Sequence, residues 1–264
     1  FEPPKLENRS EGVGNLLAQR RDDPAFDAWV RQNTVAHKHP DYSCLTISLK
    51  TIGDAPGDAS DTQMEAIADL AETYSRDELR VSHEQNLVLP HVAQGDLRVI
   101  YDVLVEQRLA EANIGLVSDI IACPGLDYCA LANARSIPVA QNIAQRFASP
   151  ERHAEIGPLK MKISGCINAC GHHHVGHIGI LGVDKKGTEL FQITLGGSAD
   201  ENTSIGEIIG RGFTYDDITD AIETVIDTYI GLRTSTDEAF IDAYRRVGPQ
   251  PFKDALYGDT KRAA

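Results

Sequence analysis

The sequence predicts an α+β fold made of two units, a β-α-β-β-α unit followed by a unit of the α/β type. Three observations lead to this prediction. In the first part of the chain, short stretches of alternating apolar and polar residues are separated by stretches with helical spacing. Two apolar stretches, residues 116–122 and 160–164, each run into a pair of cysteines. A hairpin pattern and two amphipathic helices then complete the chain.

The first unit is predicted to occupy residues 27–112, after a linker or tail at residues 1–26 that begins with polar and Pro-rich sequence. The pair Thr62 and Glu65 predicts a capping box that opens a helix with an apolar stripe, and Gly115 is typical of a helix stop. The expected elements, in order, are a helix at 27–34, a strand at 43–49, a helix from 62 to about 74, strands at 79–82 and 86–90, and a helix at about 96–111.

The second unit, residues 113–264, is predicted to begin with a buried strand at 116–122. The remaining elements are a helix at 130–147 with a kink or fresh start at Pro138, a strand at 160–164, a hairpin of 176–183 with 189–195, and helices at about 215–232 and 237–247. Each cysteine pair therefore lies on a loop that leaves a strand, where α/β folds usually place ligands.

Charge and composition exclude several classes of function. The net charge is −14 and no cluster of Lys and Arg stands out, so nucleic acid is not expected as a partner. No apolar run approaches the ~20 residues of a membrane span. The first residues, Phe1 to Lys5, lack the basic and apolar regions of a signal peptide. We therefore expect a cytoplasmic protein without a membrane partner, and the missing initiator Met indicates a processed chain or a fragment.

Four of the five cysteines form two short pairs, Cys123 with Cys129 and Cys166 with Cys170, which are separated by 36 residues. Four thiolates are the number that a [4Fe–4S] cluster needs, and glycines beside both pairs let the backbone turn around a bulky inorganic core. Zinc fits these spacings less well, and buried structural cysteines are the third alternative. Disulfides are not expected in a chain of this size without a signal peptide. Spacing alone favours iron–sulfur and leaves the zinc and structural alternatives open, while Cys44 is expected to be a core residue.

The residues around both cysteine pairs resemble a known family. The segments from Ala122 to Cys129 and from Ser164 to Gly171 are similar to the signature of the sirohaem-dependent sulfite and nitrite reductases, and so is the segment from Arg80 to Leu87. The similarity extends from about Asp27 to Tyr257. It implies a ferredoxin-like half-domain at residues 27–112, followed by a nitrite/sulfite reductase 4Fe–4S domain with a mixed sheet at residues 113–264.

The resemblance also implies the cofactors, a [4Fe–4S] cluster and sirohaem. In this family the four cysteines hold the cluster, and the last of them, here Cys170, also ligates the iron of sirohaem through the same sulfur. The residues expected to line the sirohaem pocket are Gln85, Ala122, Ser164, Asn168 and His172. Family members reduce sulfite or nitrite with six electrons, and the sequence does not separate these two substrates. The cofactor carries the difficult chemistry, while the protein supplies ligation, orientation and electrostatics.

One departure concerns length. Family members have two similar halves, and the first half supplies most of the Arg and Lys residues that grip the substrate. This chain resembles the second half of a sulfite reductase haemoprotein of sulfur assimilation, so its catalytic residues are unknown and we expect no turnover of sulfite by the chain alone. The expected partners are the N-terminal half and an electron donor, either a flavoprotein subunit or a ferredoxin. A non-catalytic [4Fe–4S] electron carrier and a zinc-binding structural module are the rival hypotheses.

Other polar residues near the motifs have two interpretations each. His172, His174 and His177 form a metal site or simply pack and solvate. Lys160 and Lys162 share a strand face and either reach a carboxylate of the ring or face solvent. Arg80 either touches cofactor or substrate, or forms an ion pair with a carboxylate.

Overall fold

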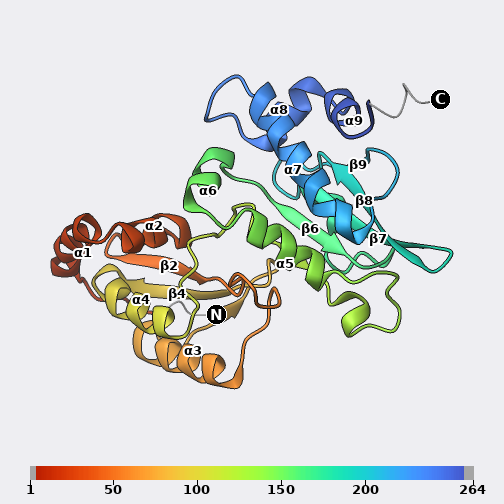
Figure 1. Ribbon diagram of the computed structural model, residues 1–264. Coiled ribbons are helices and arrows are strands. Elements are labelled where there is room, and N and C mark those ends of the chain that lie inside the picture. Colours follow the sequence, from red (N-terminus) through yellow and green to blue (C-terminus); the bar gives the residue numbers. More distant parts are fainter. Residues whose placement is uncertain (1–3, 259–264) are drawn as a thin grey trace. The chain divides into compact units, whose positions relative to one another are not determined.

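The computed structural model describes residues 4–258, and the chain divides into two compact units. The first unit comprises residues 1–51 and 57–114, and the second comprises residues 52–56 and 115–264. The short segment Ile52–Pro56 thus groups with the second unit although it interrupts the first in sequence. Figure 1 shows the elements of both units in chain order.

The first unit is an antiparallel sheet of four strands in the order β1-β2-β4-β3, with helices packed on it. Its elements are α1 (Ser10–Asp22), α2 (Pro24–Asn33), β1 (Thr34–Ala36), β2 (Tyr42–Ile47), α3 (Asp61–Tyr74), β3 (Arg80–Val81), β4 (Leu87–Ala93), η1 (Gln94–Asp96) and α4 (Leu97–Glu106). Alternate residues of β2, Leu45 and Ile47, join the helices in one hydrophobic core. The only tryptophan, Trp29, is fully buried in this core beside Phe26 and Tyr101.

Three sequence predictions for this unit need correction. Residues 10–22, expected to belong to a linker or tail, form helix α1, because Leu16 reaches the core. The capping box of α3 is made by Ser60 and Gln63 instead of Thr62 and Glu65, so the helix begins at Asp61. Helix α4 ends at Glu106, well before Gly115. The left-handed residue that follows this helix end is Arg108, with φ of +59°.

The second unit is built on a mixed sheet of five strands in the order β5-β6-β7-β8-β9. Strands β5, β6 and β7 are parallel, and β8 and β9 continue the sheet in antiparallel fashion. The elements are β5 (Ile121–Ala122), η2 (Gly125–Asp127), α5 (Ile137–Arg146), α6 (Pro150–Ile156), β6 (Met161–Ser164), η3 (His173–Val175), β7 (Ile178–Lys185), β8 (Thr188–Leu195), β9 (Glu207–Ile208), α7 (Tyr215–Leu232), α8 (Phe240–Val247) and α9 (Gln250–Tyr257). The mixed sheet and the α+β class agree with the prediction.

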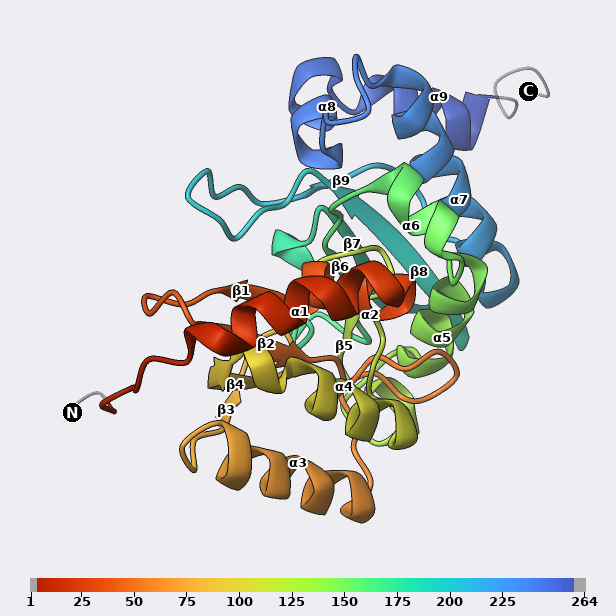
Figure 2. The ribbon, with the colours of Figure 1, turned by 90° about the vertical axis from the view of Figure 1, so that its left-hand side faces the viewer.

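Helices α5 and α7 lie side by side on one face of this sheet, as Figures 1 and 2 show. Their apolar residues and those of β6, β7 and β8 form a second core that contains Phe147, Phe191 and Phe240. None of the helices within residues 4–258 is long and apolar enough to cross a membrane.

The segments that carry the cysteines differ most from the predicted elements. Of the apolar run 116–122, only Ile121 and Ala122 form a strand. The helix expected at 130–147 begins at Ile137, and Pro138 occupies its first turn, where a missing N–H costs nothing. Residues 129–134 are instead a loop, in which the backbone N–H groups of Asn133 and Ala134 donate to the carbonyl of Gly165. The structure thus has longer loops around the cysteines than the pattern predicts.

Candidate functional site

The two cysteine pairs lie on loops that leave neighbouring parallel strands. Cys123 directly follows β5, and Cys166 comes two residues after the end of β6. Ala122 pairs with Ile163 in the β5–β6 ladder, and the backbone N–H of Cys123 donates to the carbonyl of Ile163 over 3.1 Å. Because the carboxyl ends of parallel strands meet at one edge of a sheet, both cysteine loops start from the same edge.

Gly165 joins the two loops through backbone hydrogen bonds. Its carbonyl accepts the N–H groups of Asn133 and Ala134 at 2.8 and 3.0 Å, and its own N–H donates to Sγ of Cys123 at 3.1 Å. A side chain at Gly165 would have no room, since a Cβ there would lie 2.6 Å from the carbonyl oxygen of Ala134. The first cysteine loop is therefore fixed against the second by the residue that precedes Cys166.

The four cysteines differ in exposure. Cys123 and Cys166 are buried, Cys129 is half-buried and Cys170 is exposed. Residues 4–258 contain no group of three or more His, Cys, Asp and Glu side chains placed to hold one metal ion. This finding applies to the four cysteines and also to the alternative histidine site, since His172, His174 and His177 are not assembled around one point.

The cysteine loops nevertheless fit an iron–sulfur cluster. A [4Fe–4S] cluster takes one thiolate at each iron, so its four sulfurs need not reach a common ion. The N–H of Gly165 already donates to one sulfur, and such hydrogen bonds stabilise the charge of a cluster thiolate. The close approach of backbone at Gly165 holds the first cysteine loop against the second, and that at Gly171 holds the second loop against Ile163 of β6.

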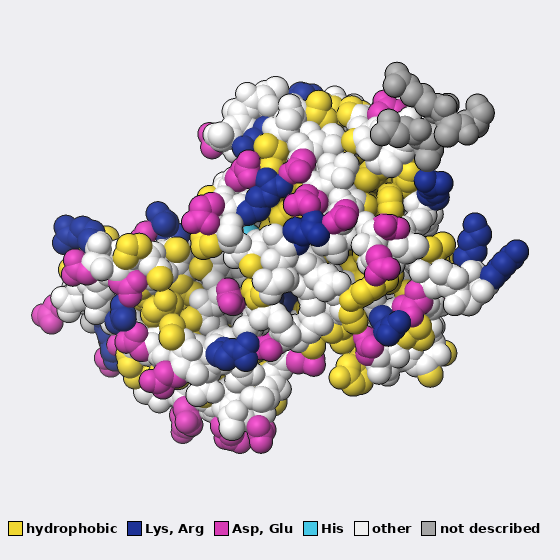
Figure 3. All heavy atoms as spheres, viewed as in Figure 1, with side chains coloured by type: hydrophobic (Ala, Val, Ile, Leu, Met, Phe, Trp, Pro, Cys, Tyr) yellow, Lys and Arg dark blue, Asp and Glu magenta, His cyan; other side chains and the backbone are white. Residues whose placement is uncertain are grey.

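Both cysteine loops carry large apolar side chains that are exposed to solvent. Leu126, Tyr128, Leu131 and Ile167 belong to the two cysteine loops and are all exposed, Ile167 by 85%. Hydrophobic side chains are visible at the lower right of Figure 3, where Figure 1 draws the loop that follows β5. Clustered apolar side chains on a surface mark a place where another molecule binds.

Four of the five predicted sirohaem-pocket residues belong to the second unit. Ala122 and Ser164 are buried at the ends of β5 and β6, whereas Asn168 and His172 are exposed in the second cysteine loop. The hydroxyl of Ser164 accepts the N–H of Gly171 at 3.2 Å. His172 has φ of +53°, a conformation that is uncommon for a residue with a side chain and often marks a functional position.

The fifth predicted residue, Gln85, belongs to the first unit and occupies a tight turn between β3 and β4. Its φ is +57°, and the backbone N–H of Ser82 closes the turn on the carbonyl of Asn86 at 2.8 Å. The ammonium group of Lys50, a buried residue, donates to the carbonyl of Glu84 at 2.7 Å in the same turn. Lys50 was not singled out from the sequence, because a Lys that follows an alternating strand normally faces solvent.

The remaining candidates have separate surroundings. Arg80 donates to Glu78 at 2.7 Å and so forms an ion pair, one of the two roles predicted for it. Lys162 is buried within β6 and Lys160 is exposed just before it. Cys44 is half-buried, and burial raises the pKa of its thiol, which donates to the carbonyl of Pro90 at 3.2 Å.

His173 and His177 are buried beyond the second cysteine pair. The pKa of each is lowered to about 4, mainly by burial, with a contribution from the neighbouring His174 at His173. The ring of His173 stacks on His174 at 4.0 Å between centroids, and Nδ1 of His177 accepts the N–H of Lys160 at 3.2 Å. Both rings are therefore neutral at physiological pH.

We expect the second unit to lose stability as the pH falls from about 7.5 to about 5. The unfolded chain protonates His177 near its ordinary pKa of 6.5, but the folded chain does so only near 4, so acid favours the unfolded state. Each pH unit in this window costs up to about 1 kcal/mol. Urea unfolding followed by far-UV circular dichroism measures the loss, and the H177N variant should show a weaker dependence. An equal pH dependence in H177N would contradict this assignment.

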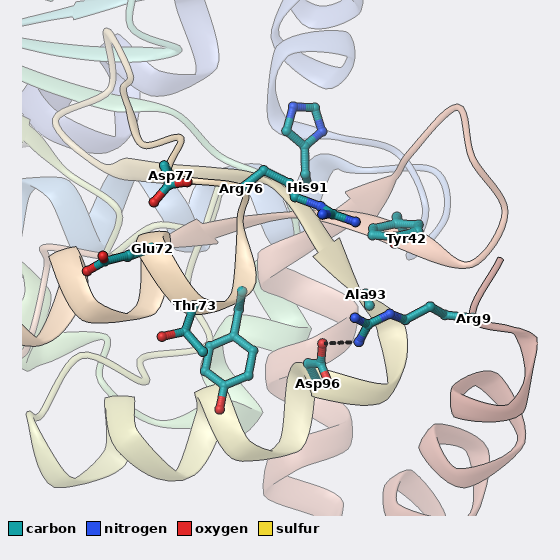
Figure 4. A pocket seen from close by; sticks show the side chains of 10 residues that line it. Arg9, Tyr42, Glu72, Thr73, Arg76, Asp77, His91, Ala93 and Asp96 are labelled. Carbon is teal, nitrogen blue, oxygen red and sulfur yellow. Dashed lines mark hydrogen bonds and ion pairs between the residues drawn. The ribbon is translucent and has the colours of Figure 1, made fainter. Parts of the chain in front are cut away.

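A polar pocket of about 280 Å³ lies in the first unit and contains none of the predicted site residues. Its lining includes the arginines Arg9 and Arg76 and the carboxylates of Glu72, Asp77 and Asp96, and Arg9 pairs with Asp96 at 3.4 Å (Figure 4). The lining thus carries three carboxylates and two guanidinium groups, an arrangement with no excess of positive charge for an oxyanion.

Comparisons with known proteins agree with this geometry. Residues 116–260 match the family model of the nitrite and sulphite reductase 4Fe-4S domain, and residues 37–107 match that of the nitrite/sulfite reductase ferredoxin-like half domain. A ferredoxin–nitrite reductase of Zea mays is 31% identical over 58% of this chain and 28% of its own length. Sulfite reductase [ferredoxin] 2 of Mycolicibacterium paratuberculosis is 30% identical over 75% of this chain and 38% of its own length.

Two solved structures share the fold. The NirA protein of Mycobacterium tuberculosis superposes with a TM-score of 0.69 and 22% identity, over 83% of this chain and 41% of that chain. The dissimilatory sulfite reductase I superposes with a TM-score of 0.66 and 13% identity, over 81% of this chain and 69% of that chain. The chain spans about a third of the length of the two curated relatives named above.

The fold and the paired cysteine loops define an iron–sulfur oxidoreductase domain preceded by a ferredoxin-like half-domain. The chain belongs to the nitrite and sulphite reductase family. The resemblance predicted from the sequence is therefore confirmed, and so is the prediction of a [4Fe–4S] cluster and sirohaem as the cofactors of the family.

Proposed function

We propose that the chain is the cofactor-binding part of a sulfite reductase haemoprotein, an enzyme that reduces sulfite to sulfide with six electrons. The observation that carries the proposal is the joining of the two cysteine loops by Gly165 at the ends of adjacent parallel strands. The support for sulfite is the similarity to the sulfite reductase of M. paratuberculosis, which is 30% identical over 75% of the chain.

In this proposal each cysteine has a defined role. Cys123, Cys129, Cys166 and Cys170 would hold the [4Fe–4S] cluster, and the exposed Cys170 would also ligate the iron of sirohaem. When bound, the two cofactors would relay electrons from the donor and provide the iron at which the small oxyanion is reduced. The protein contributes thiolates, the N–H of Gly165 on one sulfur, and a loop that holds Cys170 toward the surface.

Five residues are proposed for the sirohaem pocket. Asn168 and His172 offer exposed polar groups beside Cys170, and Ala122 and Ser164 lie at the ends of the strands that carry the loops. Gln85, in the turn held by Lys50, would hydrogen-bond a carboxylate at the edge of the ring. The exposed apolar side chains of the cysteine loops would be covered by the ring or by the rest of the enzyme.

Nitrite is the second candidate substrate, because the nitrite reductase of Zea mays is 31% identical to this chain. An anion in an electron-rich site needs fixed positive charge, and the net charge of this chain is −14. We therefore propose that the substrate-binding Arg and Lys residues come from an N-terminal half and that this chain alone does not turn over sulfite.

The proposed electron donor is a ferredoxin, because both curated relatives named above are ferredoxin-dependent by name. A flavoprotein subunit is the alternative donor. We place the enzyme in the cytoplasm, where thiols stay reduced and available to iron.

The test is anaerobic loading of the 264-residue chain with iron, sulfide and sirohaem. We expect intense Soret and red absorption bands, an EPR signal of a reduced [4Fe–4S] cluster, and no sulfide release from sulfite with an artificial electron donor. Adding the N-terminal half of a relative should restore turnover, and the ratio of kcat/KM values for sulfite and nitrite then identifies the substrate.

Other spectra would support the rival functions. A broad cluster absorption without haem bands would indicate an electron carrier, and a colourless protein with stoichiometric zinc would indicate a structural module. Substantial sulfite reduction by the isolated chain would refute the proposal that the substrate-binding residues lie elsewhere.

A further inference from the structure

The hydroxyl of Ser136 lies 3.3 Å from Sγ of Cys123, although the two residues are 13 positions apart. Ser136 has no exposed surface, and Cys123 is also buried. A buried hydroxyl needs a hydrogen-bond partner, and this one has the sulfur within reach. The contact joins the start of α5 to the first cysteine of the candidate cluster site.

Ser136 stands immediately before α5, where a serine side chain usually caps the helix by accepting a backbone N–H. It makes no such cap, although its carbonyl accepts the N–H of Ala140 at 3.0 Å as the first bond of the helix. The side chain of Ser136 is therefore directed away from the helix and toward the cysteine.

The hydroxyl fills the narrow space between the two cysteine loops. A Cβ at Gly125 would lie 2.7 Å from Oγ of Ser136, and one at Gly165 would lie 2.9 Å from the same atom. Glycine at both positions leaves room for the hydroxyl. The backbone N–H of Gly165 reaches Sγ of Cys123 as well, at 3.1 Å, so two polar groups converge on one sulfur.

A cluster-bound cysteine is a thiolate and can only accept hydrogen bonds, so the hydroxyl of Ser136 must be the donor in the loaded protein. Reduction adds negative charge to the cluster and its thiolates. Donors to the sulfurs stabilise the reduced state and raise the reduction potential. We propose that Ser136 is a positioning residue that acts through Cys123 and raises the reduction potential of the cluster. This inference rests on the proposed function, because it requires the cluster at these cysteines.

The test is an EPR-monitored redox titration of the loaded 264-residue chain and its variants. The S136A variant should keep its iron but show a midpoint potential that is more negative than that of the unsubstituted protein. The S136T variant keeps the hydroxyl and should restore the potential. The matched control is S118A, since Ser118 is another buried serine of the second unit whose hydroxyl lies 3.0 Å from Nε2 of His153; its potential should be unchanged.

Resonance Raman spectra of the unsubstituted protein give a second readout if S136A does not retain the cluster. Hydroxyl protons exchange in D₂O much faster than buried, hydrogen-bonded amides, so a rapid shift of an Fe–S(Cys) band would report Ser136. Equal potentials in S136A and the unsubstituted protein, or the lack of a rapid shift, would overturn this inference alone. An unsubstituted chain that takes up no cluster would instead overturn the proposed function, and this inference with it.

Discussion

Alanine at Cys166 is expected to abolish loading of the [4Fe–4S] cluster, whereas alanine at Cys44 should leave iron content unchanged. Cys166 is buried. It directly follows Gly165, whose carbonyl and N–H form hydrogen bonds with the other cysteine loop. No other cysteine of the second unit is available to replace it, since Cys123, Cys129 and Cys170 are the remaining proposed ligands. A cluster that loses one of its four thiolates loses the intact [4Fe–4S] form.

Iron and sulfide analysis, with the EPR signal of the reduced cluster, measures this result on anaerobically loaded protein. Cys44 is the matched control because it is also a cysteine with limited exposure, but in strand β2 of the first unit. Burial raises the pKa of its thiol, which therefore stays protonated and is a poor ligand. Full iron content in C166A, or loss of iron in C44A, would show that the cluster is held elsewhere.

The sequence predicted that each cysteine pair lies on a loop after a strand, because the relevant information is local. The hairpin of β7 and β8 and the strand β6 follow directly from alternation of apolar residues, and the helix at 215–232 agrees with α7 in both bounds. Cys-x5-Cys and Cys-x3-Cys on loops after strands need no tertiary information to be noticed.

The loops themselves could not be predicted in this way. The segment 130–136 has helical composition, but Asn133 and Ala134 donate their N–H groups to Gly165, a contact between residues more than thirty positions apart. Such a tertiary bond overrides local helix propensity. Pro138 was the one local indication that the helix starts later, because proline fits the first turn of α5.

Polar residues at the site were missed for a related reason. Ser136 fell inside the helix predicted at 130–147, and Lys50 followed a predicted strand like a surface lysine, because sequence does not show which hydroxyl or ammonium is buried. Helix α1 was missed because its residues are mostly polar and only Leu16 is buried. In each case the deciding partner is distant in the chain.

Alanine at Gly171 is expected to destabilise the second unit by about 3 kcal/mol or more, at the upper end of what overpacking costs. A Cβ at this position would lie 1.9 Å from the carbonyl oxygen of Ile163 and 2.8 Å from its carbonyl carbon. Both atoms belong to the backbone of β6, which is hydrogen-bonded to β5 on one side and to β7 on the other. The strand cannot move away without breaking the hydrogen bonds of both ladders, so relieving the clash costs free energy of folding.

Urea unfolding followed by far-UV circular dichroism measures this effect, and fluorescence of Trp29 reports the first unit separately, because Trp29 is the only tryptophan. The control is G231A, since Gly231 lies in α7 and a Cβ there meets nothing within 4 Å; it should stabilise the protein by roughly 0.5–1 kcal/mol. A G171A variant as stable as the unsubstituted protein would disprove this close packing. Because Gly171 directly follows the exposed Cys170, the packing that keeps β6 intact also holds the proposed bridging thiolate in place, so G171A should lose sirohaem binding together with stability.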